Sequence, residues 1–412
     1  MGEATIEKLI DGYVDRLKET GCGLSNGLSP RVERALRRVP RHRLVETFFY
    51  LPWPPPQQGE RPQRYEVDPT APTPEVLELV YSDQALITRL DEQGRPTSST
   101  SQPSLVAIML EELELAPGMK VLEIGAGTGY NAALIAEMVG DPALVTTVDI
   151  QPDVVAQTTR LLRRSGYEAI RVLHGDGAAG NPEGAPYDRI VAAAGCPEVS
   201  WAWAQQLAPN GLMLVPLQHG GPFSDPLVKL GKADGHLSGR MSAYSGFMQL
   251  QGELSGPNPW PDELPDPGER PPDEEHPLPP ALTDSGMDER SFRACRRAWW
   301  DFHFFLAMCD LRAHRGPEGL GMAGGGGSML RVTEDGVRVW GDSGIYRDLM
   351  AIYDQWESLG RPQLTDWETE LHPLPCLALP RRPSSEQAPW MVERGTSRQL
   401  FRLAPSVGRE GE

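Results

Sequence analysis

The feature that most constrains the fold of this chain is a glycine-dense turn that directly follows a short apolar segment. Residues 121–131 read Val-Leu-Glu-Ile-Gly-Ala-Gly-Thr-Gly-Tyr-Asn. Glycine lets the backbone approach a ligand where a Cβ atom would collide, and a turn of this kind ends at the start of a helix. The glycines give the pattern G-x-G-x-G, but Tyr130 stands where a dinucleotide fingerprint has its third glycine. The segment therefore predicts a strand, a ligand-binding turn and a helix, and it argues against a pyrophosphate site.

Acidic residues stand at the ends of three successive predicted strands. Glu123 lies two residues before the first glycine, Asp149 closes a β-rich run over 144–150, and Asp176 follows another over 170–174. A carboxylate about 20 residues past such a turn can accept hydrogen bonds from both ribose hydroxyls of a cofactor. The first acid can face an ammonium group, and the third can accept from an adenine amino group. This layout is typical of an S-adenosylmethionine site. The alternative is a Rossmann-like domain in which the three acids only cap the strand ends.

The segments around the turn alternate between predicted helices and strands. Residues 131–139 and 153–165 have helical spacing. Residues 187–194 and 207–216 supply a fourth and a fifth strand, and the fourth is largely apolar, as expected of a strand covered on both faces. Such alternation favours right-handed crossovers and an open sheet. We therefore predict the α/β class: a doubly wound, mostly parallel sheet of the Rossmann-like class I methyltransferase type, with a smaller C-terminal α+β appendage.

Several further segments carry a resemblance to a known family. They are Val39-Pro40-Arg41-His42, Tyr81-Ser82-Asp83-Gln84-Ala85-Leu86, Thr100-Ser101-Gln102-Pro103-Ser104-Leu105-Val106-Ala107, Gly175-Asp176-Gly177, Ala192-Ala193-Ala194 and Gln205-Gln206-Leu207-Ala208-Pro209-Asn210-Gly211. With Tyr130, they resemble the protein-L-isoaspartate O-methyltransferases over residues 25–220. The chain departs from that family in a proline-rich insertion at 51–74, in Ser98-Ser99-Thr100, and in nearly two hundred residues after Pro216. These departures concern the substrate, and not the cofactor.

The resemblance also implies roles for single residues. Ser101 matches the family residue beside the transferred methyl group, so we expect it to position the acceptor; an N-cap for the helix from Pro103 onward is the alternative. An acceptor carboxylate is already ionised at neutral pH, so we expect no general base. The residues expected to bind S-adenosyl-L-methionine, which leaves as S-adenosyl-L-homocysteine, are Thr100, Ser101, Gln102, Glu123, Gly125, Ala126, Gly127, Asp149, Ile150, Asp176 and Gly177. We expect His42 and His174 to be structural.

The chain after the predicted sheet changes composition twice. Residues 227–230 and the run after Asp234-Gly235 predict a hairpin. Residues 251–290 are dense in proline and acid and have few apolar residues, which predicts an extended linker. The predicted divisions are a methyltransferase domain (1–250), this linker (251–290) and a substrate-recognition appendage (291–412).

The predicted appendage has elements of its own. An aromatic stripe at helical spacing is more typical of a core than of a binding face, and it consists of Phe292, Cys295, Trp299, Trp300, Phe302, Phe305, Leu306 and Cys309. Residues 324–328 lack the Lys and Ser/Thr of a phosphate loop, so they predict a flexible loop. Residues 329–340 predict a hairpin around Asp335-Gly336, and residues 346–359 predict a helix.

Composition excludes some classes of function. The 412 residues carry a formal net charge of −18, which opposes nucleic-acid binding because such binding needs a basic face. No apolar run approaches the roughly 20 residues that span a bilayer, and the N-terminus lacks the regions of a signal peptide. The five cysteines are scattered and have no C-x-x-C spacing, so we expect reduced thiols and no metal site. We expect a cytoplasmic monomer that binds no membrane.

Two enzymatic functions and one non-catalytic function fit these observations. The first is methylation of an aspartyl side chain in a dedicated, ribosomally made peptide, where the methyl ester closes to a succinimide (aspartimide). The second is general repair, in which isoaspartyl sites of damaged proteins are methylated. The third is a binding module without catalysis, which the intact glycines and the three acids argue against. We predict the first function, because a repair enzyme must accept many sequences and gains nothing from a large extra domain.

Overall fold

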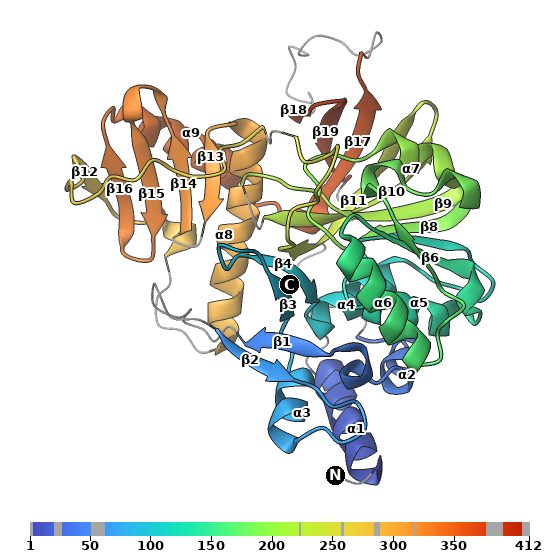
Figure 1. The fold of residues 1–412 in the computed structure, drawn as a ribbon. Helices are drawn as coiled ribbons and strands as arrows, with labels where there is room; N and C mark the ends of the chain where they lie inside the picture. The colour runs from blue at the N-terminus through green and yellow to red at the C-terminus, as the bar shows by residue number, and fades with distance from the viewer. Residues whose placement is uncertain are drawn as a thin grey trace. The chain divides into compact units, whose positions relative to one another are not determined.

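The protein folds into two compact units. The computed structural model describes residues 3–19, 27–50, 62–221, 224–256, 259–283, 289–316, 319–375 and 390–405 (Figure 1). Unit 1 consists of residues 1–194, 200–215 and 250–253. Unit 2 consists of residues 195–199, 216–249 and 254–412. Residues 216–249 thus fold with the C-terminal part of the chain, and the predicted division at residue 250 does not coincide with the border between the units.

Unit 1 contains a parallel sheet with the strand order β9-β8-β5-β6-β7. Its strands are β5 (Val121–Ile124), β6 (Val145–Asp149), β7 (Arg171–His174), β8 (Tyr187–Ala192) and β9 (Leu207–Pro216). The chain builds the sheet outward from β5, first to one side and then to the other. Ligands of open α/β sheets bind at the carboxyl ends of the strands at such a switch point. The doubly wound α/β fold is therefore confirmed, and it places a candidate site after β5.

Helices precede or connect these strands, as Figure 1 shows for the teal and green part of the chain. They are α4 (Pro103–Glu112), α5 (Tyr130–Val139), α6 (Pro152–Arg164) and α7 (Trp201–Gln206). In α6 the buried residues lie at helical spacing on one face, and they are Val154, Gln157, Thr158, Leu161 and Leu162. Gly140 ends α5 in the left-handed conformation, with a φ of 81°. Both helices predicted after the glycine turn are confirmed to within one residue.

The N-terminal part of unit 1 adds helices and a small sheet. The helices are α1 (Glu3–Glu19), α2 (Pro30–Arg38) and α3 (Pro74–Val80), with a 3-10 turn η2 (Arg41–Leu44). The antiparallel sheet has the order β2-β1-β3-β4, formed by β1 (Thr47–Tyr50), β2 (Gln63–Glu66), β3 (Leu86–Leu90) and β4 (Pro96–Thr100). Residues 51–61 of the proline-rich insertion lie outside the described residues. Because β4 ends at Thr100 and α4 begins at Pro103, Ser101 lies in the connection between a strand and a helix.

Unit 2 contains an antiparallel group of strands in the order β18-β19-β17-β11-β10. They are β10 (Asp225–Ala233), β11 (His236–Ser245), β17 (Trp367–Pro373), β18 (Trp390–Glu393) and β19 (Ser397–Leu403). The predicted hairpin around Asp234-Gly235 is confirmed, since Ala233 pairs with His236. Pairing of β11 with β17 explains why residues 216–249 belong to this unit.

A second antiparallel sheet of unit 2 has the order β12-β16-β15-β14-β13. Its strands are β12 (Glu274–His276), β13 (Ala313–Gly316), β14 (Gly319–Ala323), β15 (Met329–Thr333) and β16 (Gly336–Trp340). The hairpin predicted around Asp335-Gly336 is confirmed, and the glycine-rich segment is a short turn, η7 (Gly325–Gly327), between antiparallel strands. Helix α9 (Gly344–Ser358) also agrees with the sequence.

Helix α8 (Glu289–Cys309) carries the aromatic stripe into the core of unit 2. Phe302, Phe305 and Leu306 are fully buried, as predicted for a core face. The side chains of Phe292 and Cys295 lie outside the described residues. None of the described helices has the length and apolar character needed to span a membrane.

The segment 251–290 is not an extended linker in its described part. It contributes β12 to the second sheet and the 3-10 turn η6 (Pro280–Leu282). Trp260 is buried, and its Nε1 donates a hydrogen bond to the carbonyl of Ala307 at 2.9 Å. The low apolar content predicted that nothing here would be buried, but Trp260 and Leu282 are buried and β12 pairs with β16.

Candidate active site

The glycine turn after β5 requires glycine at the positions where the chain is most crowded. Gly127 has a φ of 51°, and a Cβ atom there would lie 2.8 Å from the carbonyl oxygen of Ser99. Gly129, with a φ of 82°, precedes α5, and a Cβ atom there would lie 3.0 Å from side-chain atoms of Thr158 and Leu162. The turn is therefore pressed against the end of β4 on one side and against α6 on the other. This contact brings the Thr100–Gln102 connection next to the glycine turn.

Glu123 is a buried carboxylate at the end of β5. Its side chain is 1% exposed, and it accepts hydrogen bonds from Asn131 Nδ2 at 2.7 Å and from Thr147 Oγ1 at 2.6 Å. Burial raises the pKa of Glu123 to about 7, and the nearby charge of Asp149 acts in the same direction. A cation placed beside this carboxylate would restore its ionised form. The prediction that Glu123 faces an ammonium group stays a prediction, and Asn131 and Thr147 are partners that the sequence did not single out.

Asp149 ties the second strand end to the glycine turn. Its Oδ2 accepts from the backbone N–H groups of Ala126 and Gly127, at 3.0 and 3.4 Å, and its Oδ1 accepts from the N–H of Gln151 at 3.0 Å. Three backbone donors therefore fix the orientation of one carboxylate. Oδ1 keeps capacity for one further donor, whereas Oδ2 already accepts two hydrogen bonds, which is the usual capacity of a carboxylate oxygen. The structure thus brings Ala126, Gly127 and Asp149 together, as the sequence predicted, and Ile150 follows directly.

Asp176 occupies the third strand end. Its Oδ1 accepts from the N–H of Ala178 at 2.9 Å and caps the turn η4 (Gly177–Ala179). Its Oδ2 accepts from the N–H of Glu253 at 2.8 Å. At Gly177 a Cβ atom would lie 2.6 Å from Ile124 Cγ2, so this turn packs directly on the end of β5. Glu253 lies 77 positions from Asp176 in the chain, and no pattern in the sequence predicted this contact.

The connection that contains Ser101 is held by a buried arginine. Arg41 is 0% exposed, and its guanidinium donates to the carbonyl oxygens of Thr100 at 3.3 Å and Ser101 at 2.9 Å. It also donates to the carbonyls of Val80, at 2.7 Å, and Gln84, at 3.0 Å. Arg41 thus fixes the backbone on which Ser101 stands. The Pro-Arg-His motif was the only sign of this role in the sequence, and it gave no partner.

The capping alternative for Ser101 is wrong. Gln102 is the N-cap residue of α4 and makes no side-chain cap hydrogen bond. Asp83 satisfies this helix end instead, because its Oδ1 accepts from the N–H of Ser104 at 2.8 Å and its Oδ2 accepts from Gln102 Nε2 at 3.2 Å. The side chain of Ser101, which is half-buried, is therefore not engaged in capping.

Two histidines beside the site have local partners. Nδ1 of His42 lies 2.8 Å from the hydroxyl of Tyr81, and burial lowers the pKa of His42 to about 4. Nε2 of His174 lies 3.2 Å from the carbonyl oxygen of Ile150. His42 is therefore packed into the interior of unit 1, whereas the contact of His174 lies at the surface.

The arrangement fits a ligand with a cation, a diol and an amino group. Backbone can approach the ligand at the glycine turn, and the acids at the three strand ends offer acceptors. Among the described residues, Asn131 Oδ1 and Thr100 Oγ1 are buried polar atoms without a hydrogen-bond partner. Thr100 closes β4 and Asn131 bonds Glu123 near the end of β5, so a ligand at these strand ends could supply the missing partners. The residues predicted to bind S-adenosylmethionine therefore have a suitable environment.

Comparison with known proteins gives consistent matches. A family model described as Protein-L-isoaspartate(D-aspartate) O-methyltransferase matches residues 66–254. The protein-L-isoaspartate O-methyltransferase of Methanopyrus kandleri is 36% identical over 243 residues, which are 58% of this chain and 90% of that protein. The protein of the same name from Thermotoga maritima is 31% identical over 293 residues, 69% of this chain and 81% of that protein. A solved structure of a protein-L-isoaspartate O-methyltransferase is 24% identical, with a TM-score of 0.49, and covers 88% of this chain and 96% of its own.

Proposed function

The chain belongs to the protein-L-isoaspartate O-methyltransferase family, and from this premise we propose that it is a general repair enzyme for isoaspartyl sites in damaged proteins. It is a methyltransferase that uses S-adenosyl-L-methionine. The length of the match to the Thermotoga maritima protein carries the proposal. That match takes in 69% of 412 residues, about 284, which is more than residues 1–254 contain. A relative named for the general activity therefore shares part of unit 2, so the extension is no reason to infer a dedicated peptide.

The earlier prediction of a dedicated, ribosomally made substrate with aspartimide as the product has no comparable support. It depended on the idea that a repair enzyme has no use for a large extension. Because the match to the Thermotoga maritima protein extends beyond the catalytic sheet of this chain, that argument no longer holds. We therefore propose repair in its place.

The chemistry requires positioning more than acid–base catalysis. The cofactor supplies a methyl group on a positively charged sulfur, which is already activated for transfer. The acceptor carboxylate is ionised at neutral pH, so no residue needs to remove a proton from it. Alignment of two reacting groups in one site can lower the barrier by roughly 7–11 kcal/mol. In this chain we assign that alignment to Ser101, on a backbone fixed by Arg41, and cofactor binding to Glu123, Asp149 and Asp176.

Methylation of an isoaspartyl carboxylate leads to repair through the substrate's own chemistry. The methyl ester has a better leaving group than the free carboxylate. The backbone nitrogen of the following residue attacks the ester carbonyl, methanol leaves, and a five-membered succinimide forms. Water then opens this ring at either carbonyl, and one of the two products is the normal aspartyl peptide. Repeated cycles convert isoaspartyl sites to aspartyl sites.

A matched pair of peptides tests the proposal. The full-length protein is incubated with S-adenosyl-L-methionine and either an isoaspartyl peptide or the aspartyl peptide of the same sequence, and released methanol is measured. We expect turnover of the isoaspartyl peptide and background with the aspartyl peptide. Several unrelated isoaspartyl sequences should also be turned over with similar efficiency. Methylation of neither peptide, or preference for the aspartyl form, would overturn the repair function.

A further inference from the structure

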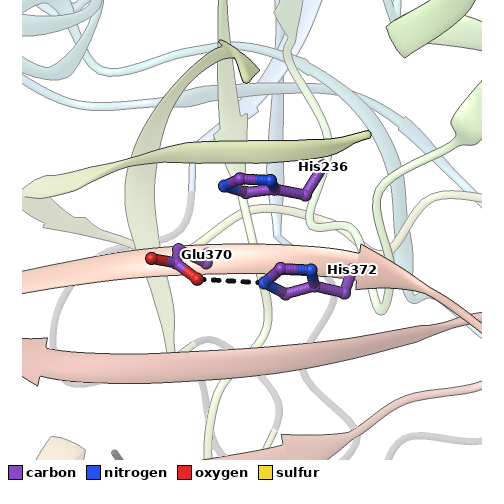
Figure 2. A group of neighbouring side chains, drawn as sticks. All are labelled: His236, Glu370 and His372. Carbon is purple, nitrogen blue, oxygen red and sulfur yellow. Dashed lines mark hydrogen bonds and ion pairs between the residues drawn. The ribbon is translucent and has the colours of Figure 1, made fainter. Parts of the chain in front are cut away.

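We propose that unit 2 carries a binding site for a divalent d-block cation, with Zn²⁺ as the best fit, formed by His236, Glu370 and His372. Figure 2 shows the three side chains on two neighbouring strands, with His236 on β11 and the other two on β17. Leu237 pairs with Leu371, so position 236 lies next to position 372 in the sheet. Glu370 and His372 are separated by one residue and therefore lie on the same face of β17. This inference is independent of the proposed function.

The three side chains are almost close enough to share one cation. One ligand atom from each lies within 4.8 Å of the others. Nε2 of His372 and Oε2 of Glu370 are 3.0 Å apart, and the two imidazole rings are stacked with centroids 4.5 Å apart. Zn²⁺ takes imidazole nitrogen and carboxylate oxygen at 2.0–2.2 Å, so two ligands of a tetrahedral ion lie about 3.4 Å from each other. Because the rings are stacked, at least one imidazole must turn about its side-chain bonds to bring all three atoms to these distances.

The surroundings of His236 and Glu370 are those of metal ligands. Nδ1 of His236 lies 3.1 Å from the carbonyl oxygen of Asp234, so this nitrogen carries the proton and Nε2 keeps its lone pair for a cation. Oε1 of Glu370 accepts from Arg402 Nη1 at 2.8 Å, and a cation bound by Oε2 and His372 Nε2 would take the place of the proton that these two atoms share. Histidines that bind metals donate their other N–H to a carbonyl or carboxylate, and carboxylate ligands are themselves hydrogen-bonded. The charge of Arg402 partly opposes a cation, but it also fixes the carboxylate in place.

A second histidine–glutamate pair in unit 2 shows what is special about this group. Nε2 of His276 lies 3.0 Å from Oε2 of Glu274, the same separation as in the His372–Glu370 pair. The ring of His276 stacks on Tyr346, whose neutral phenol is a poor ligand for Zn²⁺. An ion pair alone thus explains the His276 group. In the other group, the stacking partner is another imidazole with a free ring nitrogen, and this third ligand is the feature that an ion pair does not explain.

The donor set selects the class of cation. Two imidazole nitrogens and one carboxylate suit Zn²⁺, Cu²⁺ or Ni²⁺, whereas Mg²⁺ and Ca²⁺ prefer sites made of oxygen alone. Water would complete the coordination, because the three groups are only half-buried. A bound cation would cross-link the β10–β11 hairpin to the C-terminal strands. It would therefore stabilise unit 2 by binding only to the folded chain.

Zinc binding to the full-length chain tests the proposal. The protein is freed of any affinity tag, treated with a chelator and dialysed, and Zn²⁺ is titrated against a chromophoric competitor. We expect one Zn²⁺ per wild-type chain and at least tenfold weaker binding in His236→Gln and in His372→Gln. His276→Gln, which breaks the matched pair, should bind as wild type does. Mg²⁺ at the same concentration should not compete.

A second measurement keeps the test valid if a variant folds poorly. Circular dichroism in the presence of chelator establishes whether each variant is folded, and only folded variants are compared. In wild type, Zn²⁺ should raise the thermal midpoint, and Co²⁺ should give a visible absorption band that Zn²⁺ abolishes. No band in wild type, or equal Zn²⁺ affinity of wild type and folded His236→Gln and His372→Gln, would overturn the proposal.

Discussion

The two units use buried polar groups in different ways. In unit 1 the carboxylates of Asp149 and Asp176 lie at strand ends and are oriented by backbone N–H groups. In unit 2 buried charges join segments that are far apart in the chain. Arg394 is 5% exposed and donates to the carbonyls of Pro197, at 2.7 Å, and Gln218, at 2.9 Å. Burial lowers the pKa of Arg394 to about 9. Polar groups at strand ends leave room for a ligand, whereas those inside unit 2 replace apolar packing between distant segments.

Arg41 shows that the distinction is one of position and not of residue type. Like Arg394, it is a buried arginine that donates to several backbone carbonyls. Because one of these carbonyls belongs to Ser101, its contacts also fix a residue of the candidate active site. We therefore expect buried arginines to matter for folding in both units, and for catalysis only in unit 1.

The largest effect should come from Arg394→Met, which removes the donors to two buried carbonyls. Hydrogen bonds from a charged donor contribute about 1.5–3 kcal/mol each, so the loss of those to Pro197, Gln218 and Gln399 should lower the free energy of unfolding by about 3 kcal/mol or more. Denaturant unfolding measures this loss, and calorimetry should show unchanged affinity for S-adenosyl-L-methionine. Arg338→Met, at an arginine that is 43% exposed in the same unit, is the control and should change stability little. A loss below 1 kcal/mol in Arg394→Met would contradict a structural role for its buried hydrogen bonds.

The next effect concerns the cofactor. Asp149→Ala should weaken binding of S-adenosyl-L-methionine by roughly 2–4 kcal/mol, because it removes charge-assisted hydrogen bonds and frees the glycine turn. Isothermal titration calorimetry measures the change. Asp153→Ala removes an exposed acid from the start of α6, four residues away, and should bind the cofactor as wild type does. Equal affinities of Asp149→Ala and Asp153→Ala would show that Asp149 does not bind the cofactor.

Ser101→Ala should affect the acceptor more than the cofactor. We expect methyl transfer to an isoaspartyl peptide to fall by about a hundredfold, since a misplaced acceptor loses alignment, while cofactor affinity stays within a small factor. Ser104→Ala, in the first turn of α4, is the matched control and should retain activity. If Ser101→Ala is as active as this control, the positioning role is wrong.

The smallest effect compares one buried acid from each unit. Burial raises the pKa of Glu123 and of Asp225 to about 7. The protonated forms of these two carboxyl groups are therefore favoured more in the folded chain than in the unfolded chain. The resulting stabilisation is complete below the pKa of the unfolded chain and is lost as the pH rises through 7. Between pH 6 and pH 8 each group should lower the free energy of unfolding by about 1 kcal/mol.

Two variants separate the acids in that experiment. Glu123→Gln and Asp225→Asn should each remove their own share of the decline between pH 6 and pH 8, measured by denaturant unfolding. Only Glu123→Gln should also weaken binding of S-adenosyl-L-methionine, because only that acid lies at the candidate site. Weaker cofactor binding in Asp225→Asn, or unchanged cofactor binding in Glu123→Gln, would contradict the different roles of the two units.

The sequence by itself determined the part of the protein that local patterns encode. A strand followed by G-x-G-x-G and a helix, with acids closing three successive strands, predicted the doubly wound sheet and the place of the site, because parallel strands end at one edge. Turn residues likewise predicted the hairpins at Asp234-Gly235 and Asp335-Gly336, since such turns depend on only a few neighbouring residues.

Tertiary structure alone decided what depends on contacts between distant residues. Arg41 reaches Ser101 over 60 positions, and β11 pairs with β17 although more than a hundred residues separate them. The second contact moves residues 216–249 into unit 2 and brings His236 beside His372. No spacing or composition reports such contacts, because they arise when strand pairing and burial bring remote segments together. For the same reason the prediction of an extended linker over 251–290 was wrong. The burial of Trp260 depends on its contact with α8 and not on its neighbours in the sequence.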